Sequence, residues 1–150
     1  MILSAFYGAD SNGTDALRST YSAAEKETLD ALIITDGRIA KEALLAAQDA
    51  KERGKKIGVL LLEEIKPYED AAARILPYIP QKNAKVLFLE EEIYAGGMGM
   101  MLRDALGGAL DGKEVSILAL KDSFGVQKKN EPVLCSFGLD RDAVLKTLGF

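Results

Sequence analysis

The sequence predicts an α/β fold of three layers, in which helices cover both faces of a mainly parallel sheet of about five strands. Two observations carry this prediction. Short apolar runs typical of buried strands recur at 31–35, 57–62, 85–89 and 115–120. The segments between them have the apolar spacing of helices, and strands joined by such helices form parallel β-α-β crossovers. We therefore expect a helix–sheet–helix sandwich.

The first predicted strand is Ala31–Thr35, a continuous apolar run that suits a strand buried on both faces. Asp36-Gly37 then turns the chain into a helix, which Gly54 is placed to end. One face of this helix carries Ile39, Ala43, Ala47 and Ala50. The second strand, Ile57–Leu62, is closed by Lys66-Pro67.

The second half of the chain repeats this alternation. A helix that ends at Pro77 and Pro80 places four apolar residues together: Ala72, Ile75, Leu76 and Ile79. After the third strand, Lys85–Leu89, the next helix aligns Leu102, Ala105, Leu106 and Ala109. The fourth strand, Val115–Leu120, precedes a short last helix with Asp140 as its cap. Its inward residues are predicted to be Val144, Leu145 and Leu148.

Residues 1–30 form a predicted N-terminal extension that packs on the domain made by residues 31–150. Ile2–Tyr7 is a candidate edge strand, and Gly8–Gly13 has the composition of a loop. Thr14–Asp30 is expected to be partly helical.

Composition excludes several classes of function. A net charge of −4 without a basic cluster argues against nucleic acid and anionic membranes as partners. No apolar run reaches the roughly 18–20 residues that a membrane span needs. With one cysteine, Cys135, no intrachain disulfide forms, and we expect a cytoplasmic protein. The absence of histidine excludes Ser-His and Cys-His hydrolases and His-ligated metal sites.

The segment after the third strand is the candidate interface or ligand loop. It contains Glu90, Glu91, Glu92, Gly96, Gly97 and Gly99. Gly97-Met98-Gly99 matches part of a dinucleotide fingerprint, but its third glycine is replaced by Leu102. The glycines are interpreted first as a tight turn with close helix packing, with anion or nucleotide binding as alternatives.

The three glutamates at the end of this strand point to alternate sides of an extended backbone, so Glu90 and Glu92 are predicted to converge while Glu91 points away. One interpretation is that these glutamates act in general acid–base catalysis or bind a hard cation. A solvated or interface-capping role is the interpretation we favour. No catalytic residue and no metal ligand is predicted.

Four motifs in order resemble the transketolase C-terminal domain family, with 1-deoxy-D-xylulose-5-phosphate synthase the most similar member. The resemblance runs from about Asp30 to Phe150. The motifs are ALIITDG at 31–37, the Lys-Pro-x-acidic motif within 65–69, Glu90-Glu91 followed by Gly96-Gly97-Met98-Gly99, and the tail from Asp122 and Phe124 to Phe137-Gly138-Leu139-Asp140.

The resemblance implies that thiamine diphosphate and Mg²⁺ are held by two upstream domains, so this chain alone binds neither and a partner chain would hold both. It also implies that the C-terminal domain packs at a dimer interface and lends substrate contacts. Lys66 belongs to the Lys-Pro motif, and the synthases carry a phosphate-contacting arginine where this chain has Glu63. Their usual glycine in the tail is Lys128 here. Both departures weaken the expectation of phosphosugar binding.

Three functions follow as hypotheses. The first is a non-catalytic subunit or accessory part of a split thiamine-diphosphate-dependent transferase, docked through 90–99 on a chain with the cofactor domains. The alternative is a self-associating binding or regulatory module that has lost the family chemistry, which Glu63 favours. A small independent enzyme that uses the glutamates with a divalent cation is the least favoured. Burial of the family's usual interface predicts a homo-oligomer, most simply a dimer.

Overall fold

The computed structural model describes residues 7–8, 16–93, 96–120 and 140–150. Its sheet has six strands in the order β1-β2-β4-β3-β5-β6. These are β1 (Tyr7–Gly8), β2 (Leu17–Ser19), β3 (Ala31–Asp36), β4 (Ile57–Leu62), β5 (Lys85–Ile93) and β6 (Glu114–Leu120). Strand β3 pairs in parallel with both β4 and β5, and β5 pairs in parallel with β6. The predicted parallel sheet is confirmed.

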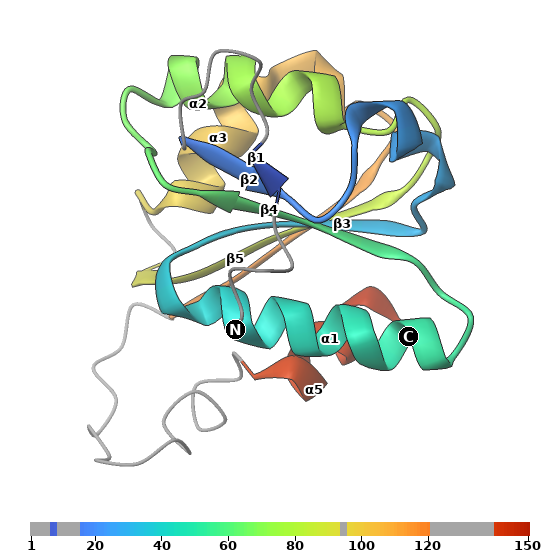
Figure 1. Ribbon diagram of the computed structural model, residues 1–150. Helices are drawn as coiled ribbons and strands as arrows, with labels where there is room; N and C mark the ends of the chain where they lie inside the picture. The colour runs from blue at the N-terminus through green and yellow to red at the C-terminus, as the bar shows by residue number, and fades with distance from the viewer. Residues whose placement is uncertain (1–6, 9–15, 94–95, 121–139) are drawn as a thin grey trace.

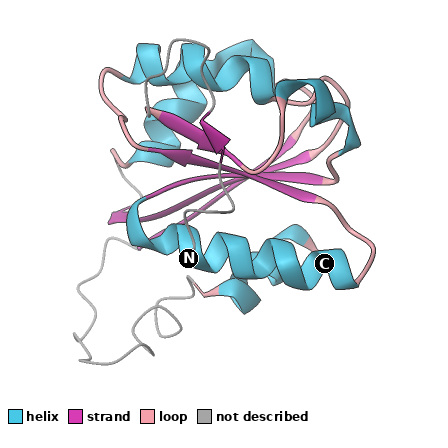
Figure 2. Cartoon of the chain, viewed as in Figure 1, coloured by secondary structure: helices cyan, strands magenta, loops and turns pink. Residues whose placement is uncertain are grey.

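Helices cover both faces of this sheet (Figures 1 and 2). Helices α1 (Ala40–Glu52) and α5 (Arg141–Leu148) lie on one face, whereas α2 (Tyr68–Ile75) and α3 (Met98–Leu106) lie on the other. Short 3-10 helices connect them: η2 (Ala23–Thr28), η3 (Gly37–Ile39), η4 (Leu76–Tyr78) and η5 (Gly107–Leu110). The three predicted layers are therefore present.

Strand β3 shows why the central strands are apolar throughout. Its residues 31–34 are completely buried. Ile33 packs in the cluster beneath α1 and α5, while Leu32 and Ile34 belong to the cluster beneath α2 and α3. A strand with a helical layer on each side has no solvent face, so the alternation of polar and apolar residues disappears.

The helix ends follow from their local sequence. Gly54 adopts a φ of +77° just after α1, a conformation that glycine accepts without steric cost. The Asp140 carboxylate accepts a hydrogen bond from the backbone N–H of Ala143 and caps α5 as predicted. The three predicted inward residues of α5 are all buried.

Two residues of the predicted apolar helix faces are exposed. Ala105 is exposed on α3. Leu76 is 46% exposed, because α2 ends at Ile75 and a 3-10 turn that contains Pro77 directs the following side chains differently.

The segment 14–30 is partly helical, as predicted, but it also contains a strand that the sequence did not indicate. Leu17–Ser19 forms β2, which pairs antiparallel with β4 and brings the sheet to six strands. Leu17 and Ser19 are buried while Arg18 is half-buried, which is the two-residue period of a strand with one covered face. Among the described residues 16–30, the helical part is η2. Of the predicted strand Ile2–Tyr7, only Tyr7 lies within the described residues, in β1.

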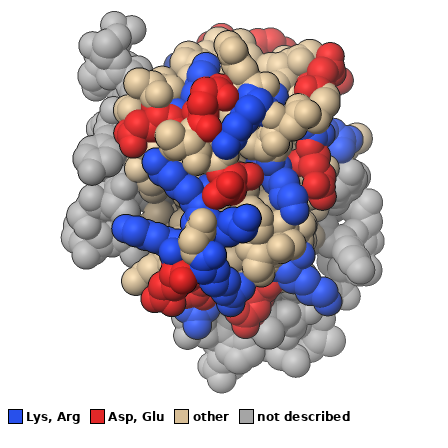
Figure 3. Space-filling view, turned by 90° about the vertical axis from the view of Figure 1, so that its right-hand side faces the viewer, with Lys and Arg blue, Asp and Glu red and all other residues tan. Residues whose placement is uncertain are grey.

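Basic and acidic side chains are interspersed on the molecular face shown in Figure 3. A surface of mixed sign attracts a polyanion far less than a basic stripe does. Among the helices of the described residues, none has the length and apolarity needed to cross a bilayer.

Candidate functional site

The candidate loop lies at the carboxyl edge of the sheet. Strand β5 extends past the predicted Leu89 through the three glutamates to Ile93, and α3 begins at Met98. The pairing of β5 with β6 shifts register between Leu89 and Ile93. Just before this irregularity, the buried Thr35 hydroxyl donates to the Leu89 carbonyl at 2.8 Å and ties β3 to β5.

Glu90 is fully buried, and its Oε2 accepts a hydrogen bond from the backbone N–H of Gly99 at 2.8 Å. Gly99 lies in the first turn of α3, where backbone N–H groups have no partner within the helix and favour a negative charge. Of the predicted solvated or interface-capping roles, the solvated one is wrong for Glu90, and the interface-capping one stays a prediction. Its carboxylate fixes the start of α3 against the end of β5.

Glu91 lies on the other side of the strand, as predicted from the alternation. Both of its oxygens accept from the Nε of Arg38 at 2.9 Å. Arg38 belongs to η3, before α1, and its side chain is 77% exposed. The side chain of Glu92 lies outside the described residues, so its predicted convergence with Glu90 stays a prediction.

The glycines of the loop have separate roles. Gly96 adopts a φ of +75°, which favours glycine, and Gly97 is the extended cap residue of α3. At Gly99, an added Cβ would lie 2.9 Å from the Cβ of Phe88 and 3.0 Å from Cγ2 of Ile117. Gly99 therefore lets α3 approach the sheet closely, which confirms the packing interpretation.

The two predicted substrate-contact positions lie elsewhere on the carboxyl edge. Glu63 and Lys66 follow β4 and are exposed, and the Lys66–Pro67 peptide bond is cis. In the sheet order, β3 separates β4 from β5, so these residues and the 90–99 loop share an edge but follow non-adjacent strands.

Arg18 is the nearest basic partner of Glu63, and the sequence alone did not indicate it. Its Nε lies 3.3 Å from Oε1 of Glu63. Arg18 lies close to Glu63 because β2 pairs antiparallel with β4, with Arg18 opposite Leu61. The negative charge at position 63 is therefore partly compensated within the chain.

The remaining predicted positions of the tail fall outside the described residues. They are Asp122, Phe124, Lys128, Cys135, Phe137, Gly138 and Leu139. Within the described ranges, no group of three or more Asp, Glu, Cys or His side chains could hold a metal ion.

These features define a class: a three-layer α/β domain in which a buried glutamate, at the carboxyl edge of a parallel sheet, holds the glycine-containing first turn of the next helix. A family model described as the transketolase C-terminal domain matches residues 21–144. The chain belongs to this family, as its motifs had indicated.

Curated relatives agree with this assignment. The chain is 27% identical over 114 residues to the 1-deoxy-D-xylulose-5-phosphate synthase of Clostridium tetani. This matched region covers 76% of this chain and 18% of the relative. It is 28% identical over 117 residues to the synthase of Carboxydothermus hydrogenoformans, with coverage of 78% and 18%. A putative transketolase C-terminal section of Methanocaldococcus jannaschii is 25% identical over 119 residues, covering 79% of this chain and 36% of the relative. The chain thus spans 18% of the length of these synthases.

Solved structures show the same fold. A protein described as a split gene transketolase, in an inactive β4 tetramer, superposes with a TM-score of 0.64 at 22% identity, covering 82% of this chain and 38% of that one. The transketolase of Campylobacter jejuni gives a TM-score of 0.52 at 15% identity, covering 88% and 18%. At these identities the likeness concerns the fold.

Proposed function

We propose that this chain is a non-catalytic subunit, or accessory part, of a split thiamine-diphosphate-dependent transferase of the 1-deoxy-D-xylulose-5-phosphate synthase type. The observation that carries the proposal is the bond from Gly99 to Glu90. The buried acid of the family motif holds the first turn of α3, which supports a structural role for Glu90 at the proposed docking edge. The family match and the synthase relatives supply the reaction type.

Thiamine diphosphate and Mg²⁺ would be held by a partner chain. Mg²⁺ binds carboxylates and phosphate oxygens together, and the family resemblance assigns these ligands to the two upstream domains. Substrate contact and chemistry then belong to the assembled enzyme, to which this chain contributes its carboxyl edge.

The solved relative described as a split gene transketolase supports a division of the enzyme between chains, and its β4 tetramer supports self-association. The exposed guanidinium of Arg38, paired with Glu91, gives the proposed docking edge an exposed polar contact point. A homodimer and a cytoplasmic location complete the proposal.

A self-associating binding or regulatory module is the second candidate. The observation that favours it is Glu63, which occupies a position where the resemblance implies a cationic phosphate contact. Its pairing with Arg18 stabilises the reversed charge. A module of this kind would bind itself and no cofactor-bearing chain.

A cofactor-binding measurement tests whether this chain alone binds thiamine diphosphate and Mg²⁺. Isothermal titration of the purified chain with thiamine diphosphate and Mg²⁺ is expected to show no saturable binding at millimolar concentrations. A micromolar dissociation constant would overturn the non-catalytic assignment.

Light scattering at increasing protein concentration is expected to give a mass above that of the monomer, and a strictly monomeric mass would contradict self-association.

A further inference from the structure

A pocket of about 330 Å³ lies at the amino edge of the sheet, opposite the edge that carries the 90–99 loop. This volume is at the lower end of the range of small-molecule sites. Its walls come from η2, from the segment that follows α2, and from the segment between α3 and β6. The lining residues are Lys26, Leu76, Ile79, Pro80, Gln81, Gly108, Ala109, Asp111 and Lys113.

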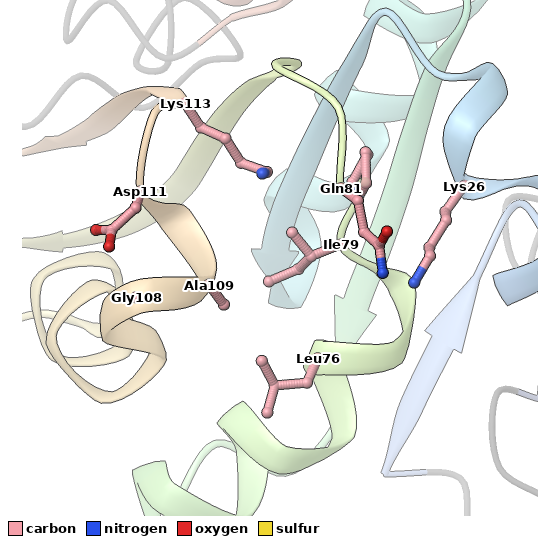
Figure 4. A pocket seen from close by; sticks show the side chains of 9 residues that line it. Lys26, Leu76, Ile79, Gln81, Gly108, Ala109, Asp111 and Lys113 are labelled. Atoms are coloured by element: carbon pink, nitrogen blue, oxygen red, sulfur yellow. The ribbon is translucent and has the colours of Figure 1, made fainter.

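Two lysines approach the pocket from opposite sides (Figure 4). Both Lys26 and Lys113 are half-buried, and within the described part of the chain neither ammonium group forms an ion pair shorter than 4 Å. A lysine stem that packs on apolar surface normally keeps its charge at the surface. Here two such charges border one concavity.

The carboxylates near the pocket are engaged or directed elsewhere. Glu27 accepts hydrogen bonds from the backbone N–H groups of Gln81 and Lys82, at 2.6 and 3.1 Å. These bonds and the neighbouring Lys26 and Lys82 charges lower the pKa of Glu27, the backbone bond from Gln81 being the largest cause. The side chain of Asp111 points away from the pocket (Figure 4).

The floor between the two lysines includes apolar side chains beside the polar Gln81. Ile79 and Pro80 are buried, and Ala109 is half-buried. Leu76 is 46% exposed, one of three large apolar side chains that stand out on the described surface. A cationic group at each side of an apolar floor complements a molecule with two anionic ends and an apolar middle.

We propose that this pocket binds a small organic dianion of the α,ω-dicarboxylate class, with its carboxylates at Lys26 and Lys113 and its methylene chain over Leu76, Ile79 and Ala109. The site lies beyond the proposed docking function, because it uses the opposite edge of the sheet and none of the 90–99 loop.

The probe that tests this site is adipate, titrated into the ¹⁵N-labelled full chain and followed by ¹H–¹⁵N spectra. We expect saturable shifts of the backbone signals of Gln81, Gly108 and Ala109. Because the ammonium groups are partly solvated, raising NaCl from about 50 to about 300 mM is expected to weaken binding. Hexane-1,6-diol, of the same length without charge, is expected to cause no saturable shift at the same concentrations.

Single substitutions measure separately what the two lysine charges and the apolar floor of the pocket contribute to binding. Lys26→Gln and Lys113→Gln are each expected to weaken adipate binding about three- to fivefold, the effect of losing one partly exposed charge contact. Leu76→Ser, at an exposed position that does not threaten folding, tests the floor and is expected to weaken binding similarly. Lys51→Gln is the charge-matched control, because Lys51 is an exposed residue of α1 on the other face of the sheet. This variant is expected to leave binding unchanged.

Three outcomes would overturn the proposal. The first is the absence of saturable shifts with adipate up to about 20 mM, a concentration high enough to detect the weak total affinity of a ligand with few atoms. The second is an equal response to hexane-1,6-diol, which would remove the role of charge. The third is an equal loss of binding in Lys51→Gln and Lys113→Gln, which would indicate general attraction of anions to the surface.

Discussion

The Oε2 of Glu90 accepts the backbone N–H of Gly99 at 2.8 Å, and both residues are buried. A carboxylate near the end of β5 thereby holds the first turn of α3. A buried carboxylate is tolerated only when it is hydrogen-bonded or paired. The bond therefore couples the stability of the domain to the position of its proposed docking edge.

The first prediction concerns this bond. Glu90→Ala is expected to lower the free energy of unfolding by about 1–3 kcal/mol, because it leaves a buried backbone donor unsatisfied. Urea unfolding measures the change. Glu91→Gln, at the neighbouring exposed pair, is the control and is expected to cost less than about 1 kcal/mol. Equal losses in the two variants would contradict the structural role of Glu90.

The second prediction concerns the close approach of α3 to the sheet. Gly99→Ala is expected to destabilise the protein by about 1–3 kcal/mol, because its Cβ would meet Phe88 and Ile117 at 3.0 Å or less. At Gly108 the nearest atom to an added Cβ is 3.6 Å away, so Gly108→Ala is the matched control with little expected loss. Thermal unfolding of both variants measures the difference. A Gly99→Ala variant as stable as the control would show that α3 packs more loosely.

The third prediction concerns alkaline pH. The buried Tyr21 hydroxyl donates to the Tyr78 carbonyl at 2.7 Å, and burial, with a smaller contribution from Tyr78, raises the pKa of Tyr21. The folded-state pKa lies above the unfolded value of about 10. The contribution of Tyr21 to stability is therefore present below about pH 10 and is lost as the pH rises toward the folded-state pKa.

Tyr21→Phe is expected to cost about 1 kcal/mol at pH 7, through the lost hydrogen bond, and to show a flatter decline above pH 10 than the parent protein. Urea unfolding at pH 7, 9 and 11 compares the two. Parallel declines in both proteins would mean that Tyr21 ionises as easily when folded as when unfolded.

The fourth prediction concerns acidic pH. The pKa of Glu27 is lowered from its ordinary value of 4.5, chiefly by the hydrogen bond from the Gln81 backbone. Because the folded-state pKa is depressed, the contribution of Glu27 is present above pH 4.5 and is lost as the pH falls below it. Glu27→Gln is therefore expected to lose less stability than the parent protein between pH 5 and pH 3. A steeper loss in the variant would exclude this role.

The central strands and the layering were predictable because burial on both faces leaves an unmistakable apolar run, as in Ala31–Thr35. The cap of α5 was predictable because Asp140 precedes an apolar helical pattern. Strand β2 was missed because three residues are too few to show a period. Its antiparallel pairing with β4, which brings Arg18 to Glu63, depends on tertiary contact alone.

The candidate site was predictable in position but not in role. The Glu-Glu and Gly-Gly motif marked the loop, yet the opposite roles of Glu90 and Glu91 depend on their partners Gly99 and Arg38, which lie at different distances along the chain. The pocket at the amino edge gave no sequence signal, because its two lysines lie 87 positions apart and meet only through the fold.

Capture of partners from native cell extract, with this chain as bait and mass spectrometry as readout, tests the central claim most directly. Arg38→Glu, which reverses the charge of the proposed contact point, is the comparison bait. We expect the parent bait to recover a chain that carries thiamine-diphosphate-binding domains, and the Arg38→Glu bait to recover much less of it. Recovery of the bait alone would contradict the split-transferase function and favour the self-associating module.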